Sequence, residues 1–163
     1  MFVGDLVDRG PDTPGVLRLV MAMVSSGDAL VVCGNHEQKL VRALRGRKVQ
    51  LSHGLAESLD QLAAQDEEFR VKVEAFCDSL IAHYVLDGGK LVVAHAGLPE
   101  RYHGRASGRV RSVALYRDTT GETDESGPLP VGTDYRGSAT VLRKWSGSTE
   151  RCAWTPAACS VGS

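Results

Sequence analysis

The chain has 163 residues and a formal net charge of −1 at pH 7, and 42% of its residues are hydrophobic. This length is enough for about one domain with a buried core. The near-zero charge argues against a strongly basic nucleic-acid-binding protein and against an acidic disordered chain, although a local basic patch can still bind nucleic acid.

Membrane and secretory signals are also missing from the sequence. No apolar run reaches about 18 residues, so we expect no membrane span, and no signal-peptide pattern opens the chain. The cysteines show no Cys-x-x-Cys spacing, which predicts reduced thiols in a cytoplasmic protein. They lie at Cys33, Cys77, Cys152 and Cys159.

The apolar pattern predicts strands and helices in alternation, which favours a layered α/β fold. Thr13 is the predicted N-cap of the first helix, Pro14 its first residue, and Gly27 its end. Residues 87–89 read Asp-Gly-Gly, a tight turn between two strands. Strands are expected at residues 2–3, 29–33, 84–86, 90–94 and 140–142. Helices are expected at 14–24, 37–44, 55–64, 67–83 and 109–117.

Polar motifs lie at the ends of three predicted strands. GDLVDRG covers residues 4–10, GNHE covers 34–37, and VVAHAGL covers 92–98. GNHE alone is also typical of a turn that starts a helix. In a parallel or mixed sheet, the ends of neighbouring strands can converge on one ligand site. The candidate site residues are Asp5, Asp8, Arg9, Asn35, His36 and His95.

These residue types suit metal-assisted phosphate chemistry. Carboxylate, amide oxygen and imidazole bind divalent ions such as Mn²⁺, Mg²⁺ or Fe²⁺, and Asp5 could bridge two ions about 3.5–4 Å apart. Arg9 offers a planar fork to phosphate oxygens. His36 is placed to protonate a leaving alkoxide, and Asp8 could hold its ring in the required tautomer.

In combination, GDLVDRG, GNHE and HAGL resemble the calcineurin-like metallophosphoesterases of the phosphoprotein-phosphatase type. Three longer stretches look like the phosphatase module of bacterial polynucleotide kinase-phosphatase, an RNA-repair enzyme. They are HGLAESLDQLAAQ, FCDSLIAHYVLDGGKLVVAHAGL and GRVRSVALYRDTTGETDESG. This closer likeness covers roughly residues 2–142. Serine/threonine protein phosphatases and diadenosine tetraphosphatases share the short motifs and stay as alternatives.

The resemblance implies a β-sandwich flanked by helices, in four layers, with two divalent metal ions. Mn²⁺ is the expected metal, and Mg²⁺, Ni²⁺ and Fe²⁺ are alternatives. By the resemblance, Asp5 bridges the two metals, while Asn35 and His95 bind the second one.

The same resemblance implies a water molecule attacking a phosphomonoester. His36 is then the catalytic acid, Asp8 orients it, and Arg9 binds the substrate phosphate. The implied substrates are phosphomonoesters, including RNA or nucleotide ends, and the parent protein could carry kinase and ligase modules.

The sequence departs from the family pattern at both ends. It lacks the early Asp-x-His-Gly and the late Gly-His-[Ser/Thr] that supply further metal ligands in the family. We therefore expect residues 1–142 to be a metallophosphoesterase domain without its first strand and with an impaired first-metal site. A catalytically dead remnant is the alternative.

Residues 143–163 show little strand or helix periodicity and are expected to be a non-native or disordered tail. Shifting the reading frame of residues 152–162 by one base allows V-C-V-D-T-G-C-V-F-G-G. That sequence resembles the last strand of the family, so we interpret the tail as frame-shifted.

Other polar residues match no motif. His53, His83 and His103 are expected to be ordinary surface or core histidines. The basic stretch RALRGRKVQ, residues 42–50, is expected to be a solvated helix end, with contact to a nucleic-acid backbone as the alternative.

Overall fold

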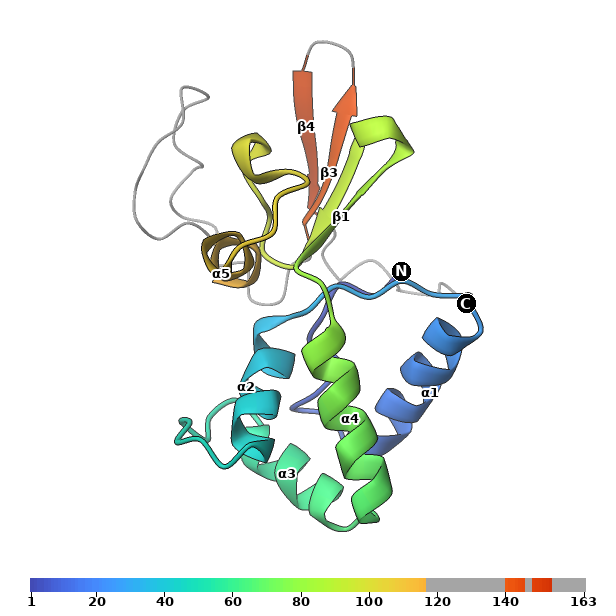
Figure 1. Cartoon of the computed structure of the whole chain (residues 1–163), viewed down its shortest axis with the longest axis vertical. Coiled ribbons are helices and arrows are strands. Elements are labelled where there is room, and N and C mark those ends of the chain that lie inside the picture. Colours follow the sequence, from blue (N-terminus) through green and yellow to red (C-terminus); the bar gives the residue numbers. More distant parts are fainter. Residues whose placement is uncertain (117–139, 146–147, 154–163) are drawn as a thin grey trace, which may run out of the picture. The chain divides into compact units, whose positions relative to one another are not determined.

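The computed structural model describes residues 1–116, 140–145 and 148–153 of the chain. The chain forms two compact units, Met1–Ala82 and His83–Ser163 (Figure 1). The first unit is mainly helical and the second contains an antiparallel sheet, so the prediction of an α/β fold is confirmed. No helix in the described ranges has the length and hydropathy needed to cross a membrane.

The first unit contains four helices, and the sequence predicted all of them. They are α1 (Thr13–Ser25), α2 (Asn35–Leu44), α3 (Leu55–Ala63) and α4 (Glu67–Ser79). Their inward faces meet in one apolar cluster that also includes Val7 of the GDLVDRG loop. Val7 therefore anchors the loop to the apolar core. The other members of the cluster are Leu17, Leu40, Val41, Leu55, Leu62, Phe69, Val73 and Cys77.

Three extended segments of this unit pair in parallel, but only through isolated bridges. Phe2 pairs with Val31, and Val32 pairs with Ile81. The Phe2 N–H donates to the Leu30 carbonyl over 2.8 Å, and the Cys33 N–H donates to the Ile81 carbonyl over 2.9 Å. The predicted strands at 2–3 and 29–33 thus lie side by side as expected, although neither forms a full ladder.

Three predicted helix boundaries are wrong. The helix expected over 37–44 already begins at Asn35. The helix expected over 67–83 ends at Ser79, because Leu80 turns to an extended conformation (φ −63°, ψ 130°) and Ile81 joins the parallel pairing. Asp12, not Thr13, is the N-cap of α1, and its carboxylate accepts a hydrogen bond from the Gly15 N–H over 2.8 Å. Thr13 is buried, and its hydroxyl lies 3.2 Å from the Ser58 hydroxyl of α3.

The second unit is built on a four-stranded antiparallel meander in the order β1-β2-β3-β4. β1 (His83–Leu86) and β2 (Leu91–Ala94) pair with Tyr84 opposite Val93, and the short 3₁₀ turn Asp87–Gly89 joins them, which confirms the predicted hairpin. The helix α5 (Gly108–Tyr116) follows.

The remaining strands overlap the predicted tail. β3 (Thr140–Trp145) pairs with β2, and β4 (Ser148–Ala153) pairs with β3. Strand structure therefore continues past residue 142. The interpretation of residues 143–163 as a frame-shifted tail stays a prediction, and residues 146–147 and 154–163 lie outside the described part.

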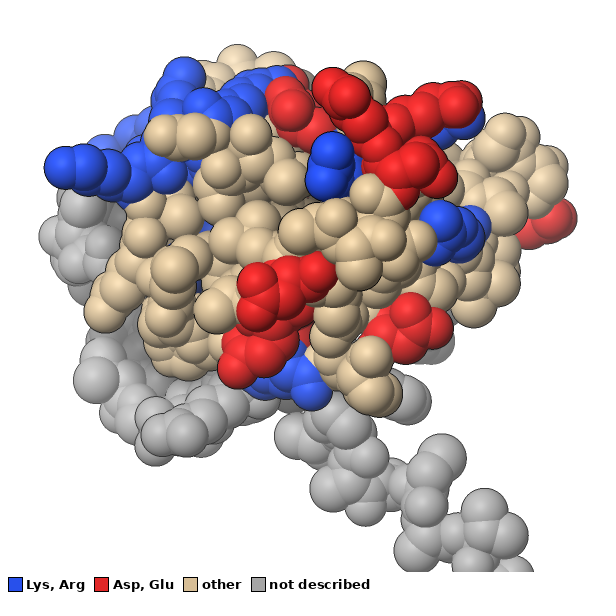
Figure 2. Space-filling model, turned by 90° about the horizontal axis from the view of Figure 1, so that it is seen from below, with Lys and Arg blue, Asp and Glu red and all other residues tan. Residues whose placement is uncertain are grey.

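Basic side chains gather along one side of the face in Figure 2, apart from most of the acidic ones. In the stretch 42–50, Arg42, Arg47 and Lys48 are exposed. Arg45 forms ion pairs with Glu74 over 2.7 Å and Asp78 over 2.8 Å, so it ties the end of α2 to α4. A solvated helix end with one cross-helix anchor agrees with this geometry, and contact with nucleic acid stays a prediction.

The core of the first unit gives a stability prediction with a matched control on the same helix. Leu17 of α1 is fully buried, whereas Leu19 is 60% exposed. Leu17→Ala should lower the free energy of unfolding by about 2–5 kcal/mol, because it removes buried methyl groups and leaves a cavity. Leu19→Ala should change it by less than about 0.5 kcal/mol. Urea unfolding followed by circular dichroism measures both, and equal effects would contradict the described packing.

Candidate active site

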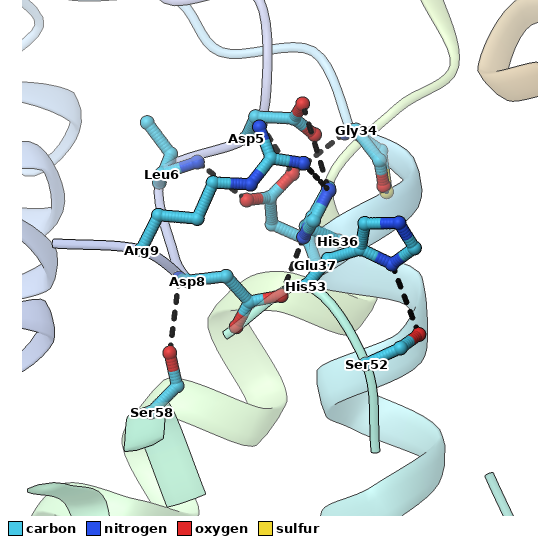
Figure 3. Close-up of polar contacts among 11 residues, drawn as sticks. Asp5, Leu6, Asp8, Arg9, Gly34, His36, Glu37, Ser52, His53 and Ser58 are labelled. Atoms are coloured by element: carbon cyan, nitrogen blue, oxygen red, sulfur yellow. Dashed lines mark hydrogen bonds and ion pairs between the residues drawn. The ribbon is translucent and has the colours of Figure 1, made fainter. Parts of the chain in front are cut away.

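The Glu37 carboxylate holds the two motifs of the first unit together. Glu37 is fully buried at the third position of α2. It accepts hydrogen bonds from three backbone N–H groups: Gly34 over 2.8 Å, Asp5 over 2.9 Å and Leu6 over 2.6 Å (Figure 3). One side chain of GNHE thereby caps its own helix and fixes the start of the GDLVDRG loop.

Close approach of the two loops explains the glycine before Asn35. A Cβ atom on Gly34 would lie 2.6 Å from the Asp5 backbone nitrogen and 2.6 Å from a Glu37 carboxylate oxygen. No side chain fits in that space, so only glycine allows Glu37 to reach both loops. Burial raises the pKa of Glu37, and the neighbouring Asp5 carboxylate adds to this, while the three N–H donors oppose it.

His36 lies at the centre of the candidate site. Its Nδ1 is hydrogen-bonded to the Asp8 carboxylate, whose side chain is fully buried. Its Nε2 lies 3.4 Å from Nη2 of Arg9 and 4.0 Å from Oδ2 of Asp5. Figure 3 shows these side chains converging from the loop and from the first turn of α2. A buried carboxylate thus orients one imidazole nitrogen and directs the other toward a cation and a second carboxylate.

The carboxylate partner also sets the acidity of the ring. The hydrogen bond that His36 donates to Asp8 raises the pKa of His36 above its ordinary value, although burial of the ring works in the opposite direction. The imidazolium form, which has a proton to give, is therefore favoured closer to neutral pH.

The GDLVDRG loop holds an unusual backbone conformation. Asp5, Asp8 and Arg9 have φ values of 55°, 71° and 60°, in the left-handed region that is unfavourable for residues other than glycine. Such residues concentrate at functional sites, where the surrounding structure fixes them. Here α3 supplies part of that support, because the Ser58 hydroxyl accepts the Asp8 N–H over 2.9 Å.

Four of the six candidate residues come together in the first unit: Asp5, Asp8, Arg9 and His36. Asn35 is the first residue of α2 and directly precedes His36. It is half-buried. His95 directly follows β2 in the second unit. Of the three expected metal ligands, Asp5 and Asn35 therefore belong to the first unit and His95 to the second.

The donor types at these positions fit the expected metals, since Asp5 offers a partly exposed carboxylate, with 26% of its side chain accessible, and Asn35 an amide. Within residues 1–116 and the described strands, no three His, Cys, Asp or Glu side chains lie close enough together to hold a metal ion. A metal centre that uses Asp5, Asn35 and His95 stays a prediction.

Sequence reasoning missed two contributors. Glu37 had a signal, because a glutamate at the third helical position is typical of a capping box. His53 had none: it was interpreted as an ordinary histidine, yet its ring centroid lies 6.4 Å from that of His36.

Comparison with known proteins decides the family. The model of the calcineurin-like phosphoesterase family matches residues 1–132. The chain belongs to the calcineurin-like phosphoesterases. The prediction that the chain belongs to the metallophosphoesterases is thereby confirmed, and this family generally uses two metal ions.

Among curated proteins, the chain is similar to bacterial proteins named bis(5′-nucleosyl)-tetraphosphatase (asymmetrical) PrpE. It is 43% identical over 148 residues to the one from Halalkalibacterium halodurans, covering 88% of this chain and 59% of that protein. With the one from Geobacillus thermodenitrificans it shares 40% over 149 residues, or 86% of this chain and 60% of that protein. With the one from Bacillus subtilis it shares 38% over 151 residues, or 87% and 61%.

The chain thus spans about 60% of the length of these relatives. The finer resemblance to the polynucleotide kinase-phosphatase module stays a prediction.

The Asp8–His36 pair gives a pH prediction for the metal-free chain. Asp8→Asn should lower the pKa of His36, because it removes the charged acceptor at Nδ1. The folded-state pKa of His36 lies above the unfolded value of about 6.5, so the pair stabilises the fold fully below that pH. That stabilisation is lost as the pH rises through the raised folded-state pKa.

Histidine proton NMR measures the pKa directly, and urea unfolding across pH 5–9 measures the stability. The free energy of unfolding of wild type should exceed that of Asp8→Asn most at the acidic end of this range. The difference should shrink above the folded-state pKa of His36. An unchanged pKa of His36 in Asp8→Asn would contradict the geometry.

Proposed function

We propose that this protein is a metal-dependent phosphoesterase that cleaves the phosphate chain of a nucleotide, with a bis(5′-nucleosyl) tetraphosphate as its substrate. The observation that carries the proposal is the arrangement of His36 between Asp8 and Arg9. It combines a proton donor, a group that orients the donor, and a cation for phosphate oxygens. The names of the relatives support a nucleotide polyphosphate as substrate.

In this proposal, Arg9 binds oxygens of the reacting phosphate. Arg9 is an exposed residue of the loop, and its guanidinium lies next to His36 Nε2. A planar guanidinium can donate two parallel hydrogen bonds to such a group. Arg9 would therefore position the phosphorus atom and neutralise part of the charge on its oxygens.

His36 acts as the general acid. Asp8 accepts the Nδ1–H, so in the imidazolium form the second proton lies on Nε2, the nitrogen beside the phosphate-binding Arg9. As the phosphorus–oxygen bond breaks, Nε2 gives its proton to the leaving oxygen, and the buried Asp8 stabilises the ring throughout. Removal of such a proton donor typically lowers the rate by about 10²–10⁴-fold.

Asp5, Asn35 and His95 would hold the divalent ions. When bound, these ions activate the attacking water and neutralise charge on the transferring phosphoryl group. The identity of the metal, with Mn²⁺ expected, stays a prediction. The interpretations as an RNA-repair end phosphatase or a serine/threonine protein phosphatase also stay predictions, as do the kinase and ligase modules.

The test is hydrolysis by the 163-residue chain in separate reactions with Mn²⁺, Mg²⁺, Ni²⁺ and Fe²⁺. The substrates are bis(5′-adenosyl) tetraphosphate, an RNA oligonucleotide with a 3′-phosphate, and a phosphoserine peptide. We expect metal-dependent cleavage of the tetraphosphate to unequal nucleotide products. Asp5→Ala and His36→Ala should each lower the rate at least about 100-fold.

Asp60→Ala, which removes an exposed carboxylate on α3, is the matched control and should retain activity. Turnover of the RNA end or the peptide alone would contradict the proposed substrate. A folded sample with no turnover above that of Asp5→Ala would contradict the proposed activity and support a catalytically dead chain.

A further inference from the structure

His53 adopts a backbone conformation that packing of its own side chain does not explain. It lies in the loop before α3 with φ at 64°, in the left-handed region, and it is exposed. A histidine there is disfavoured relative to glycine. Non-glycine residues in such conformations persist where the surroundings fix them, and they cluster at ligand sites.

The GDLVDRG loop restricts the backbone next to His53. The next residue, Gly54, has φ at 96°, and a Cβ atom on it would lie 2.4 Å from the Arg9 backbone nitrogen and 3.2 Å from the Asp8 Cβ. The Gly54 backbone is thus pressed against the part of GDLVDRG that carries the orienting carboxylate and the phosphate-binding cation. His53 has little freedom to move away from the site.

The ring of His53 lies beside the ring of His36. It meets the His36 ring edge-on, with centroids 6.4 Å apart and planes at 87°. In Figure 3 the His36 ring lies between the Arg9 guanidinium and the His53 ring. In the proposed function His36 protonates the leaving group, so a leaving group that extends past the His36 ring would reach His53.

A neighbour also contacts one of the two ring nitrogens of His53. His53 Nδ1 lies 2.9 Å from the Ser52 hydroxyl. If that hydroxyl donates, the neutral ring carries its proton on Nε2, and Nε2–H becomes a donor for an anionic oxygen. In that case Ser52 would fix the tautomer of His53, as Asp8 fixes that of His36.

We propose that His53 contacts the substrate and donates a hydrogen bond from Nε2 to a phosphate oxygen in the leaving group. Substrates whose leaving group carries at least one phosphate, such as nucleoside polyphosphates, gain this contact, whereas simple aryl phosphates do not. His53 would therefore set a preference for phosphate chains. The proposal deepens the proposed function and rests on its assignment of His36 as the leaving-group acid.

His53→Gly is the variant of choice, because glycine accepts a φ of 64° and only the imidazole is lost. Calorimetry on the full chain with Mn²⁺ measures the affinity for inorganic pyrophosphate and for orthophosphate. We expect pyrophosphate to bind about tenfold more weakly, the size expected for one hydrogen bond to a charged group. Orthophosphate affinity should change by less than about twofold, and the melting temperature should not fall.

Asp87→Gly is the matched control. Asp87 also has a left-handed φ, 51°, and is exposed, but it lies in the turn between β1 and β2. This variant likewise replaces a residue in the left-handed region by glycine, and it should leave both affinities unaltered. An equal effect of Asp87→Gly on pyrophosphate binding would overturn the assignment to His53.

Kinetics separate this proposal from the proposed function. His53→Gly should lower kcat/KM about tenfold for bis(5′-adenosyl) tetraphosphate and less than about twofold for p-nitrophenyl phosphate. If wild type cleaves only the aryl phosphate, the proposed substrate is wrong, and the pyrophosphate comparison still decides the role of His53. Equal losses for both ligands, no loss, or a wild type that does not prefer pyrophosphate over orthophosphate would each overturn the contact.

Discussion

The site of the first unit depends on one buried carboxylate. Glu37 places both of its oxygens among backbone N–H groups of the two motifs that carry the candidate residues. A buried carboxylate is tolerated only when it is hydrogen-bonded, and buried N–H groups need acceptors in the same way. Each side therefore requires the other. Because Glu37 holds the loop at Asp5 and Leu6, Asp8 lies beside His36. His36 is the residue immediately before Glu37.

The helices beneath the loop complete this arrangement. Gln61 of α3 accepts the Thr13 N–H over 2.7 Å and donates to the Gly10 carbonyl over 3.2 Å, so α3 holds the loop at its far end. Val7, between the two aspartates, is buried in the core cluster. Left-handed backbone in a polar loop can persist when hydrogen bonds and packing fix it on several sides. The apolar core is thereby connected to the chemistry, since the scaffold that buries Val7 also fixes the orientation of Asp8.

The sequence allowed the site residues of the first unit to be predicted because they follow apolar segments within short, distinctive motifs. Asp8, Arg9 and His36 could be named in this way, and the structure brings them together with Asp5. The end of α4 could not be predicted, because Leu80 and Ile81 fit a helical period and only pairing with Val32 makes them extended. Thr13 looked like a cap, but Asp12 had the better geometry. His53 was missed because a positive φ and proximity to His36 come from tertiary packing of Gly54 on the loop.

The most direct test of this account is amide hydrogen exchange by NMR in wild type and Glu37→Gln. Glutamine keeps the size of the side chain but removes the charge and one of the two acceptors. The Asp5 and Leu6 amides should exchange slowly in wild type, and at least one of them should exchange fast in the variant, while core amides of α1 and α2, such as those of Leu17 and Leu40, stay protected. Fast exchange of Asp5 and Leu6 in wild type, or unchanged protection in the variant, would contradict the central role of Glu37.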